Sequence, residues 1–292
     1  MNNHFIHKYN IFSILIFSFF IAILTGPFLS DTLLVVIGLY SIYYFRNSLF
    51  FYIKNNILIA TFFGLLVCFL ITSIFAEKPL NSIAYSLAYS RYVIFIFAIF
   101  IILTNHEAIL DKLHKLIFVL IFFIFINIFL QDLIGYDLFG NRPLFDYRLS
   151  SFFKEELIMG KITMGLLTIY LSVYYLIKKE LFNYSALTIM AISLYIILMS
   201  GERVALFNFF IYLFIYFLLM SKNNLKKTLT LIISLTVFLF IFLSLKDNVR
   251  DRVIFTTLDH ITSTNYLKNS IIPFTVYSDE HEALYNVAIE NF

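Results

Sequence analysis

Residues 113–131, LHKLIFVLIFFIFINIFLQ, decide the fold class of this chain. The run is apolar on all sides and has no polar stripe such as an amphipathic surface helix would show. About 20 residues of helix are needed to cross the roughly 30 Å hydrocarbon layer of a bilayer. Backbone polar groups inside that layer must be satisfied within the segment itself, which a helix does. The run therefore predicts a membrane-spanning helix.

The same pattern recurs along most of the chain. Hydrophobic residues make up 61% of the sequence and charged residues 13%, which lies outside the usual range of soluble globular domains. We predict an all-α, polytopic transmembrane helix bundle of about nine spans over residues 1–245, with an outer loop at 132–157. A short C-terminal segment, 246–292, follows. The predicted spans are roughly 11–25, 31–45, 57–75, 82–103, 113–131, 158–177, 184–199, 204–220 and 228–245.

Several function classes find no support in the sequence. The formal net charge is +3 and no long basic run occurs, which argues against a nucleic-acid partner. A single cysteine, Cys68, excludes disulfides and cysteine-based metal sites within one chain. No metal-ligand spacing, glycine-rich phosphate loop or nucleophile elbow is present, so we expect no metal and no cofactor.

The distribution of lysine and arginine predicts the orientation. With nine spans, ten of the 21 basic residues fall in short loops on one side, where the acids are only Glu107, Asp111 and Glu180. Positively charged loops face the cytoplasm. We therefore expect a bacterial inner-membrane protein with a cytoplasmic N-terminus and a periplasmic C-terminus. The ten residues are Lys8, Arg46, Lys54, Lys112, Lys115, Lys178, Lys179, Lys222, Lys226 and Lys227.

The arginines show a second bias. Nine of the ten cytoplasmic basic residues are lysines, whereas six arginines belong to the rest of the chain. Arginine binds phosphate through two parallel hydrogen bonds, which lysine cannot reproduce. This bias predicts an anionic ligand on the outer side, although the same arginines could pair with the acids there. The six are Arg91, Arg142, Arg148, Arg203, Arg250 and Arg252.

Two of these arginines lie in or beside predicted spans. Arg91 is well inside 82–103, where a charged side chain is costly and usually faces a cavity or a partner. A purely structural alternative is that it snorkels outward or pairs with an acid such as Glu77. Arg203 ends a four-residue polar break, Ser200-Gly-Glu-Arg203, which is too short to project into water. Glu202 could be the partner of Arg203, or the two could have separate roles. The break could equally be a tight hairpin whose charges only mark the interface.

Two further stretches carry polar residues on the outer side. Arg148 and the adjacent carboxylates Glu155 and Glu156 precede the sixth span, and the two acids could supply a general base or complement the helix dipole. Near the C-terminus, Ser278 begins a predicted helix as its N-cap. His281 and Glu282, in its first turn, are the candidate catalytic residues, and a structural role in the helix cap explains His281 about as well.

Three stretches together resemble the O-antigen ligase/polymerase family of bacterial surface-polysaccharide assembly. They are Arg148-Leu-Ser-Ser-Phe-Phe-x-Glu-Glu-Leu-Ile-x-Gly160, Ser200-Gly-Glu-Arg-Val-Ala-Leu206, and Ser278-x-Glu-His-Glu-Ala-Leu-Tyr. The order of the motifs, the long outer loop and Ser90-Arg91 agree with the family, and the resemblance covers most of the chain.

The resemblance implies a metal-independent membrane glycosyltransferase. Such enzymes move a glycan from an undecaprenyl-diphosphate donor to lipid A-core or to another lipid-linked repeat at the periplasmic face. The role of binding the donor diphosphate would fall to Arg91, Arg148 and Arg203. Family members continue beyond the position of Phe292, so we expect a truncated chain in which His281 is not the family's functional histidine. A transporter or flippase for a lipid-linked or anionic substrate, or a non-catalytic scaffold, remains an alternative.

Overall fold

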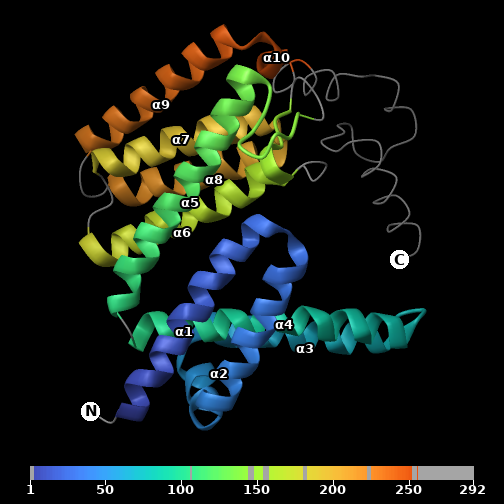
Figure 1. The fold of residues 1–292 in the computed structure, drawn as a ribbon. Coiled ribbons are helices and arrows are strands. Elements are labelled where there is room, and N and C mark those ends of the chain that lie inside the picture. Colours follow the sequence, from blue (N-terminus) through green and yellow to red (C-terminus); the bar gives the residue numbers. More distant parts are fainter. Residues whose placement is uncertain are drawn as a thin grey trace. The chain divides into compact units, whose positions relative to one another are not determined.

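The computed structural model describes residues 3–105, 107–143, 148–153, 158–179, 183–221, 225–251 and 255 (Figure 1). All regular elements in these ranges are helices, which confirms the all-α prediction. Each run predicted as a span lies within one of the first nine α-helices, to within one residue, except that the first run, 11–25, ends in the short helix η1. The elements are α1 (Asn3–Ala22), η1 (Ile23–Thr25), α2 (Pro27–Asn55), α3 (Ile57–Ile74), α4 (Pro79–Asn105), α5 (Glu107–Ile134), η2 (Ser151–Phe153), α6 (Met159–Lys178), α7 (Tyr184–Ser200), α8 (Arg203–Ser221), α9 (Leu225–Leu245) and α10 (Asp247–Arg250).

Six of these helices contain a segment long and apolar enough to cross a membrane. The six segments are Phe28–Arg46, Ile57–Ile74, Pro79–Ile101, Ile109–Ile134, Met159–Lys178 and Leu225–Leu245. Three shorter apolar helical stretches accompany them, at Ile11–Thr25, Tyr184–Ser200 and Arg203–Leu219. The protein is therefore a multi-pass membrane protein.

Local sequence explains where several helices begin and end. Gly26, at a φ of 116°, turns the chain between η1 and α2, and Pro27 starts α2 at a position where the missing N–H is not needed. The side chain of Asn56 caps α3 by accepting hydrogen bonds from the amides of Leu58 and Ile59. Gly201, in the left-handed conformation, ends α7. Helix α2 continues ten residues beyond the predicted end of its span at residue 45. It therefore includes Arg46 and Lys54, the charged residues from which the end of the span was predicted.

The chain divides into two compact units. Unit 1 comprises residues 1–120 and 169–179. Within it, α1 packs against α2 and α3 against α4, and α2 also packs against α4. A Cβ at Gly38 of α2 would lie 2.9 Å from Cγ2 of Ile94, so this glycine lets α2 and α4 approach closely.

Unit 2 comprises residues 121–168 and 180–292. Helix α7 is the most deeply packed of its helices: ten of its residues are buried, from Ala186 to Ser200. Leu231, Leu235 and Phe242 supply the buried side of α9. These residues form the apolar core that holds the helix ends, and the polar side chains at those ends, in place.

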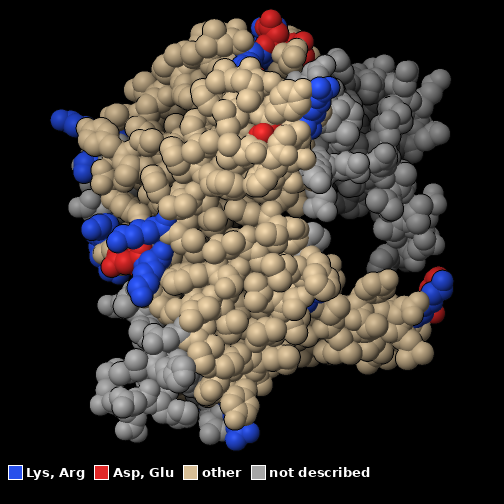
Figure 2. Space-filling model, in the orientation of Figure 1, with Lys and Arg blue, Asp and Glu red and all other residues tan. Residues whose placement is uncertain are grey.

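The helices differ strongly in their burial. Only 11% of the α3 span is buried, against 50% of the α6 span, whose residues are divided between the two units. On the face drawn in Figure 2, charged side chains gather in a few places and uncharged surface covers most of the rest. Many large apolar side chains of these helices are exposed, among them Phe28, Leu80 and Phe240, and such a surface belongs against lipid rather than water.

Candidate functional site

The loop that follows α5 is folded onto the end of that helix. The carboxylate of Asp137 accepts hydrogen bonds from the amides of Phe139 and Asn141 and from the Asn141 side chain. Gln131 then anchors the loop twice, because its Nε2 donates to the Asn141 carbonyl and its Oε1 accepts from the Ser151 amide at 2.9 Å. This network fixes the backbone close to Arg148.

The same loop meets the turn between α7 and α8. The Leu149 amide donates to the Met199 carbonyl at 2.9 Å, and Nε of Arg148 donates to the Ser200 carbonyl at 3.3 Å. The two sequence motifs that begin at Arg148 and at Ser200 therefore lie side by side in unit 2, although about 50 residues separate them. We call residues 148–151, 160 and 199–203 the α6–α7–α8 junction.

Glu202 lies inside this junction. Its side chain is only 6% exposed, and Oε1 accepts a hydrogen bond from the Gly160 amide at 2.6 Å. A Cβ at Gly160 would lie 2.5 Å from Oγ of Ser200 and 3.1 Å from Cβ of Ala205. The backbone at the start of α6 thus packs directly against the α7–α8 turn. Position 160 requires glycine because any side chain there would clash with this turn.

Burial dominates the electrostatics of Glu202 and raises the pKa of its carboxyl above the ordinary value. The Gly160 and Lys161 amides and the positive charges of Lys161 and Arg148 act in the opposite direction. No described residue completes a hydrogen bond to Oε2, which is itself buried. An unpaired charged oxygen is costly to bury, so burial makes the charged form of this carboxyl less favourable than it would be in water.

A second polar contact joins three helices of unit 2. Asp132, near the end of α5, accepts hydrogen bonds from Nζ of Lys246 and from the Tyr195 hydroxyl, at 2.5 Å and 3.2 Å. Its side chain is 14% exposed. Because the three residues belong to α5, α7 and the segment after α9, this contact ties those helix ends together.

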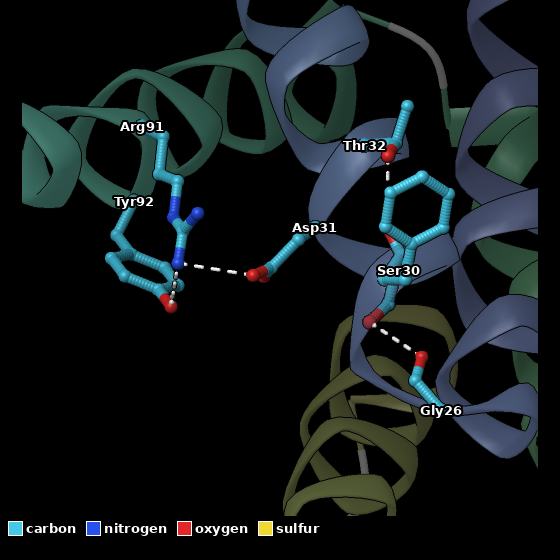
Figure 3. Close-up of polar contacts among 7 residues, drawn as sticks. Gly26, Ser30, Asp31, Thr32, Arg91 and Tyr92 are labelled. Atoms are coloured by element: carbon cyan, nitrogen blue, oxygen red, sulfur yellow. Dashed lines mark hydrogen bonds and ion pairs between the residues drawn. The ribbon is translucent and has the colours of Figure 1, made fainter.

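Arg91 lies in unit 1, about halfway along α4. Its Nη2 is 3.1 Å from Oδ2 of Asp31, and the same nitrogen donates to the Tyr92 hydroxyl at 3.0 Å (Figure 3). Asp31 is in the first turns of α2, so the acid that pairs with Arg91 is Asp31 rather than Glu77. Both side chains remain partly exposed, Arg91 by 32% and Asp31 by 40%.

An open groove of about 310 Å³ runs beside Arg91 between α2 and α4. Apolar side chains form most of its wall, including Val35, Leu39 and Ile94, and Ser90 and Arg91 supply the polar part. Arg91 is twelve residues from Pro79, which corresponds to about 18 Å along the helix axis. An anionic group bound here would contact a guanidinium and an apolar wall together.

The remaining predicted site residues have different outcomes. Arg203 is the first residue of α8, directly after the buried Glu202, and its side chain is partly buried. His281 and Glu282 lie outside the described residues, as do Glu155, Glu156 and Arg252. Within the described ranges, no group of three or more His, Cys, Asp or Glu side chains is arranged to hold a metal ion.

Sequence reasoning missed Gly160 and Asp31, and it considered Glu202 only as a partner of Arg203 and not as the acceptor of the Gly160 amide. The signals present in the sequence were the Ser200-Gly-Glu-Arg203 break and the single glycine at the start of the sixth span, neither of which identifies a partner. No family model, curated protein or solved structure matches this chain.

Proposed function

We propose that this protein is a metal-independent membrane glycosyltransferase of the O-antigen ligase/polymerase type. In this proposal it transfers a glycan from an undecaprenyl-diphosphate-linked donor to lipid A-core or to another lipid-linked repeat. The observation that carries it is the α6–α7–α8 junction, where the motif starting at Arg148 contacts the motif starting at Ser200. The two motifs support a common function because they share one site.

The main requirement of glycan transfer is stabilisation of the negative charge that develops on the diphosphate leaving group. As the bond between the anomeric carbon and the diphosphate breaks, its electron pair leaves with the phosphate oxygen. Preorganised guanidinium groups stabilise that developing charge. Arg148 and Arg203, in the junction, would bind the donor diphosphate, and the proposal assigns the same role to Arg91 in unit 1. An acceptor hydroxyl must also lose a proton, for which His281 and Glu282 remain the predicted residues.

The proposal includes a topology. The six long spans and the three shorter apolar helices would together make about nine crossings of the bacterial inner membrane. The N-terminus would be cytoplasmic and the segment after residue 245 periplasmic. One feature of unit 2 supports this arrangement: the ends of α5, α7 and α9 that meet at Asp132 are the ends assigned to the periplasmic side.

A transporter or flippase for a lipid-linked or anionic substrate is the alternative. The Asp31–Arg91 pair favours it, because an ion pair partway along a membrane helix often marks a substrate path. A transporter would move the lipid-linked glycan across the bilayer without breaking the bond to the diphosphate. The two functions therefore differ in their products.

The test uses the full-length protein from its host, purified and reconstituted in lipid vesicles with a labelled undecaprenyl-diphosphate glycan and an acceptor. Arg148→Lys and Arg203→Lys should each lower transfer by about tenfold or more, since lysine keeps the charge and loses the paired hydrogen bonds. Arg250→Lys, in an exposed pair with Asp247, is the matched control and should retain activity. Full activity of both variants would remove the α6–α7–α8 junction as the proposed donor site. Movement of the labelled lipid without glycan transfer would favour the transporter.

A further inference from the structure

The α6–α7–α8 junction contains one buried acid that the proposed chemistry does not use. Glu202 lies between α7 and α8, and the left-handed turn at Gly201 directs its side chain toward the start of α6. The carboxyl is 6% exposed, so it cannot act as a surface charge. Its position immediately before Arg203 makes it part of the same turn.

The contact that Glu202 makes is short and sterically enclosed. Oε1 accepts from the Gly160 amide at 2.6 Å, and any side chain at position 160 would collide with Ser200 or Ala205. That amide belongs to the first turn of α6, where backbone N–H groups have no partner within the helix. The carboxyl therefore satisfies one of these amides and fixes the start of α6 against the α7–α8 turn.

The charged groups around the carboxyl come from three elements. Lys161 lies on α6, Arg148 on the preceding loop and Arg203 on α8, and the charges of Lys161 and Arg148 act on Glu202. The Arg148 side chain is directed to the Ser200 carbonyl, two residues before the acid. Glu202 is thus linked to Arg148 by the hydrogen bond between Arg148 and the Ser200 carbonyl, and to Arg203 by their shared peptide bond.

We propose that Glu202 is the positioning residue of this site: its buried carboxyl holds the start of α6 against the α7–α8 turn and thereby fixes the spacing between Arg148 and Arg203. It does so as a hydrogen-bond acceptor and not through its charge. The anchoring itself is independent of what the protein does, whereas its effect on donor binding rests on the proposed glycosyltransferase function.

The experiment compares Glu202→Gln with Glu202→Ala in the full-length protein. Glutamine keeps an acceptor oxygen at nearly the same position and carries no charge, whereas alanine removes the acceptor. Asp247→Asn, at an exposed acid, is the control. The first measurement is hydrogen exchange of the amides in residues 158–164. The second is the separate kcat and KM of glycan transfer for the lipid-linked donor, from about pH 5 to pH 8.

We expect Glu202→Gln to retain slow exchange at residues 158–164 and transfer within about threefold of the parent. It should also leave the pH profile unchanged. Glu202→Ala should raise exchange there at least tenfold and raise the donor KM about tenfold. A general loss of folded protein would instead lower the amount of active enzyme and leave the donor KM unchanged.

Three outcomes would overturn the proposal. Slow exchange retained in Glu202→Ala would show that the carboxyl does not anchor α6. An unchanged donor KM in that variant would show that the arginine spacing does not depend on it. Loss of transfer in Glu202→Gln with slow exchange intact would assign the carboxylate a direct chemical role. If Glu202→Ala fails to fold, the glutamine variant alone decides between acceptor and charge. If the parent protein transfers no glycan, the proposed function fails, while the exchange measurements still test the anchoring.

Discussion

Two polar contacts in this protein connect helices far apart in the sequence, and they lie in different surroundings. In unit 2, Glu202 is buried and accepts a hydrogen bond from the Gly160 amide at 2.6 Å, and the packing around Gly160 leaves no room for a side chain at that position. In unit 1, Arg91 and Asp31 form an ion pair at 3.1 Å beside an open groove, with 32% of the Arg91 side chain and 40% of the Asp31 side chain exposed.

The difference separates a contact that builds structure from one that remains accessible to a ligand. Buried hydrogen bonds with tight packing are costly to break, because the groups left behind find no water. The ion pair between Arg91 and Asp31 is open on the side of the groove, so a competing anion that enters the groove can reach the guanidinium. We therefore expect changes at the Glu202 contact to affect folding and changes at Arg91 to affect ligand binding.

The largest expected effect on stability is that of Gly160→Ala. The added methyl would meet Ser200 Oγ at 2.5 Å, and overpacking of this kind costs about 1–3 kcal/mol. Gly165→Ala is the control on the same helix, because a Cβ there has nothing within 4 Å and gains helix propensity. Thermal unfolding in detergent measures both. Equal stability of the two variants would contradict the close contact.

Asp132→Ala should have an intermediate effect. The carboxylate of Asp132 is mostly buried and accepts hydrogen bonds from both Lys246 and Tyr195, so its removal leaves both donors without their acceptor. We expect the free energy of unfolding to fall by about 1–2 kcal/mol. Asp247→Ala, at an acid that is 72% exposed, should change the free energy of unfolding by less than about 0.5 kcal/mol. Denaturant unfolding of the two variants provides the comparison, and a smaller loss at Asp132 than at Asp247 would reverse our ranking.

A smaller effect concerns pH. Burial raises the pKa of Glu202 above its ordinary value of 4.5, so the folded protein binds the proton more tightly than the unfolded chain. The resulting stabilisation is fully present below the ordinary pKa and is lost as the pH rises through the raised pKa. Glu202→Gln should remove this dependence. Unfolding of both proteins measured from about pH 4 to pH 8 tests it, and parallel curves would show that Glu202 titrates normally.

The smallest expected effect is that of Asp31→Asn. With water in the open groove beside the pair with Arg91, the change in stability should stay within about 1 kcal/mol. Thermal unfolding in lipid nanodiscs measures it, with Asp247→Asn as the exposed control. A loss several times larger would mean that the pair faces hydrocarbon, where an arginine left without its acid is costly.

The helices were predictable from the sequence, and their partners were not. The nine predicted apolar runs all fall in helical segments to within one residue, and six of them coincide with segments long and apolar enough to cross a membrane, because the bilayer imposes both a length and an absence of charge. The extension of α2 to Asn55 was missed, since hydropathy marks the boundary of the apolar layer and not the end of the helix. For Arg91, the need for a partner was clear, whereas the choice of Asp31 over Glu77 depended on how α2 packs against α4.

The sequence by itself determined that the chain is helical, that it crosses a membrane several times, and that its arginines differ in placement from its lysines. These properties follow from composition along short stretches, because each span satisfies its own backbone hydrogen bonds. Only the tertiary structure decided that Gly160 meets Glu202, that Arg148 meets Ser200, and that Asp31 meets Arg91. Such contacts join residues 42 to 60 positions apart, and they arise from the close approach of helices that small residues permit.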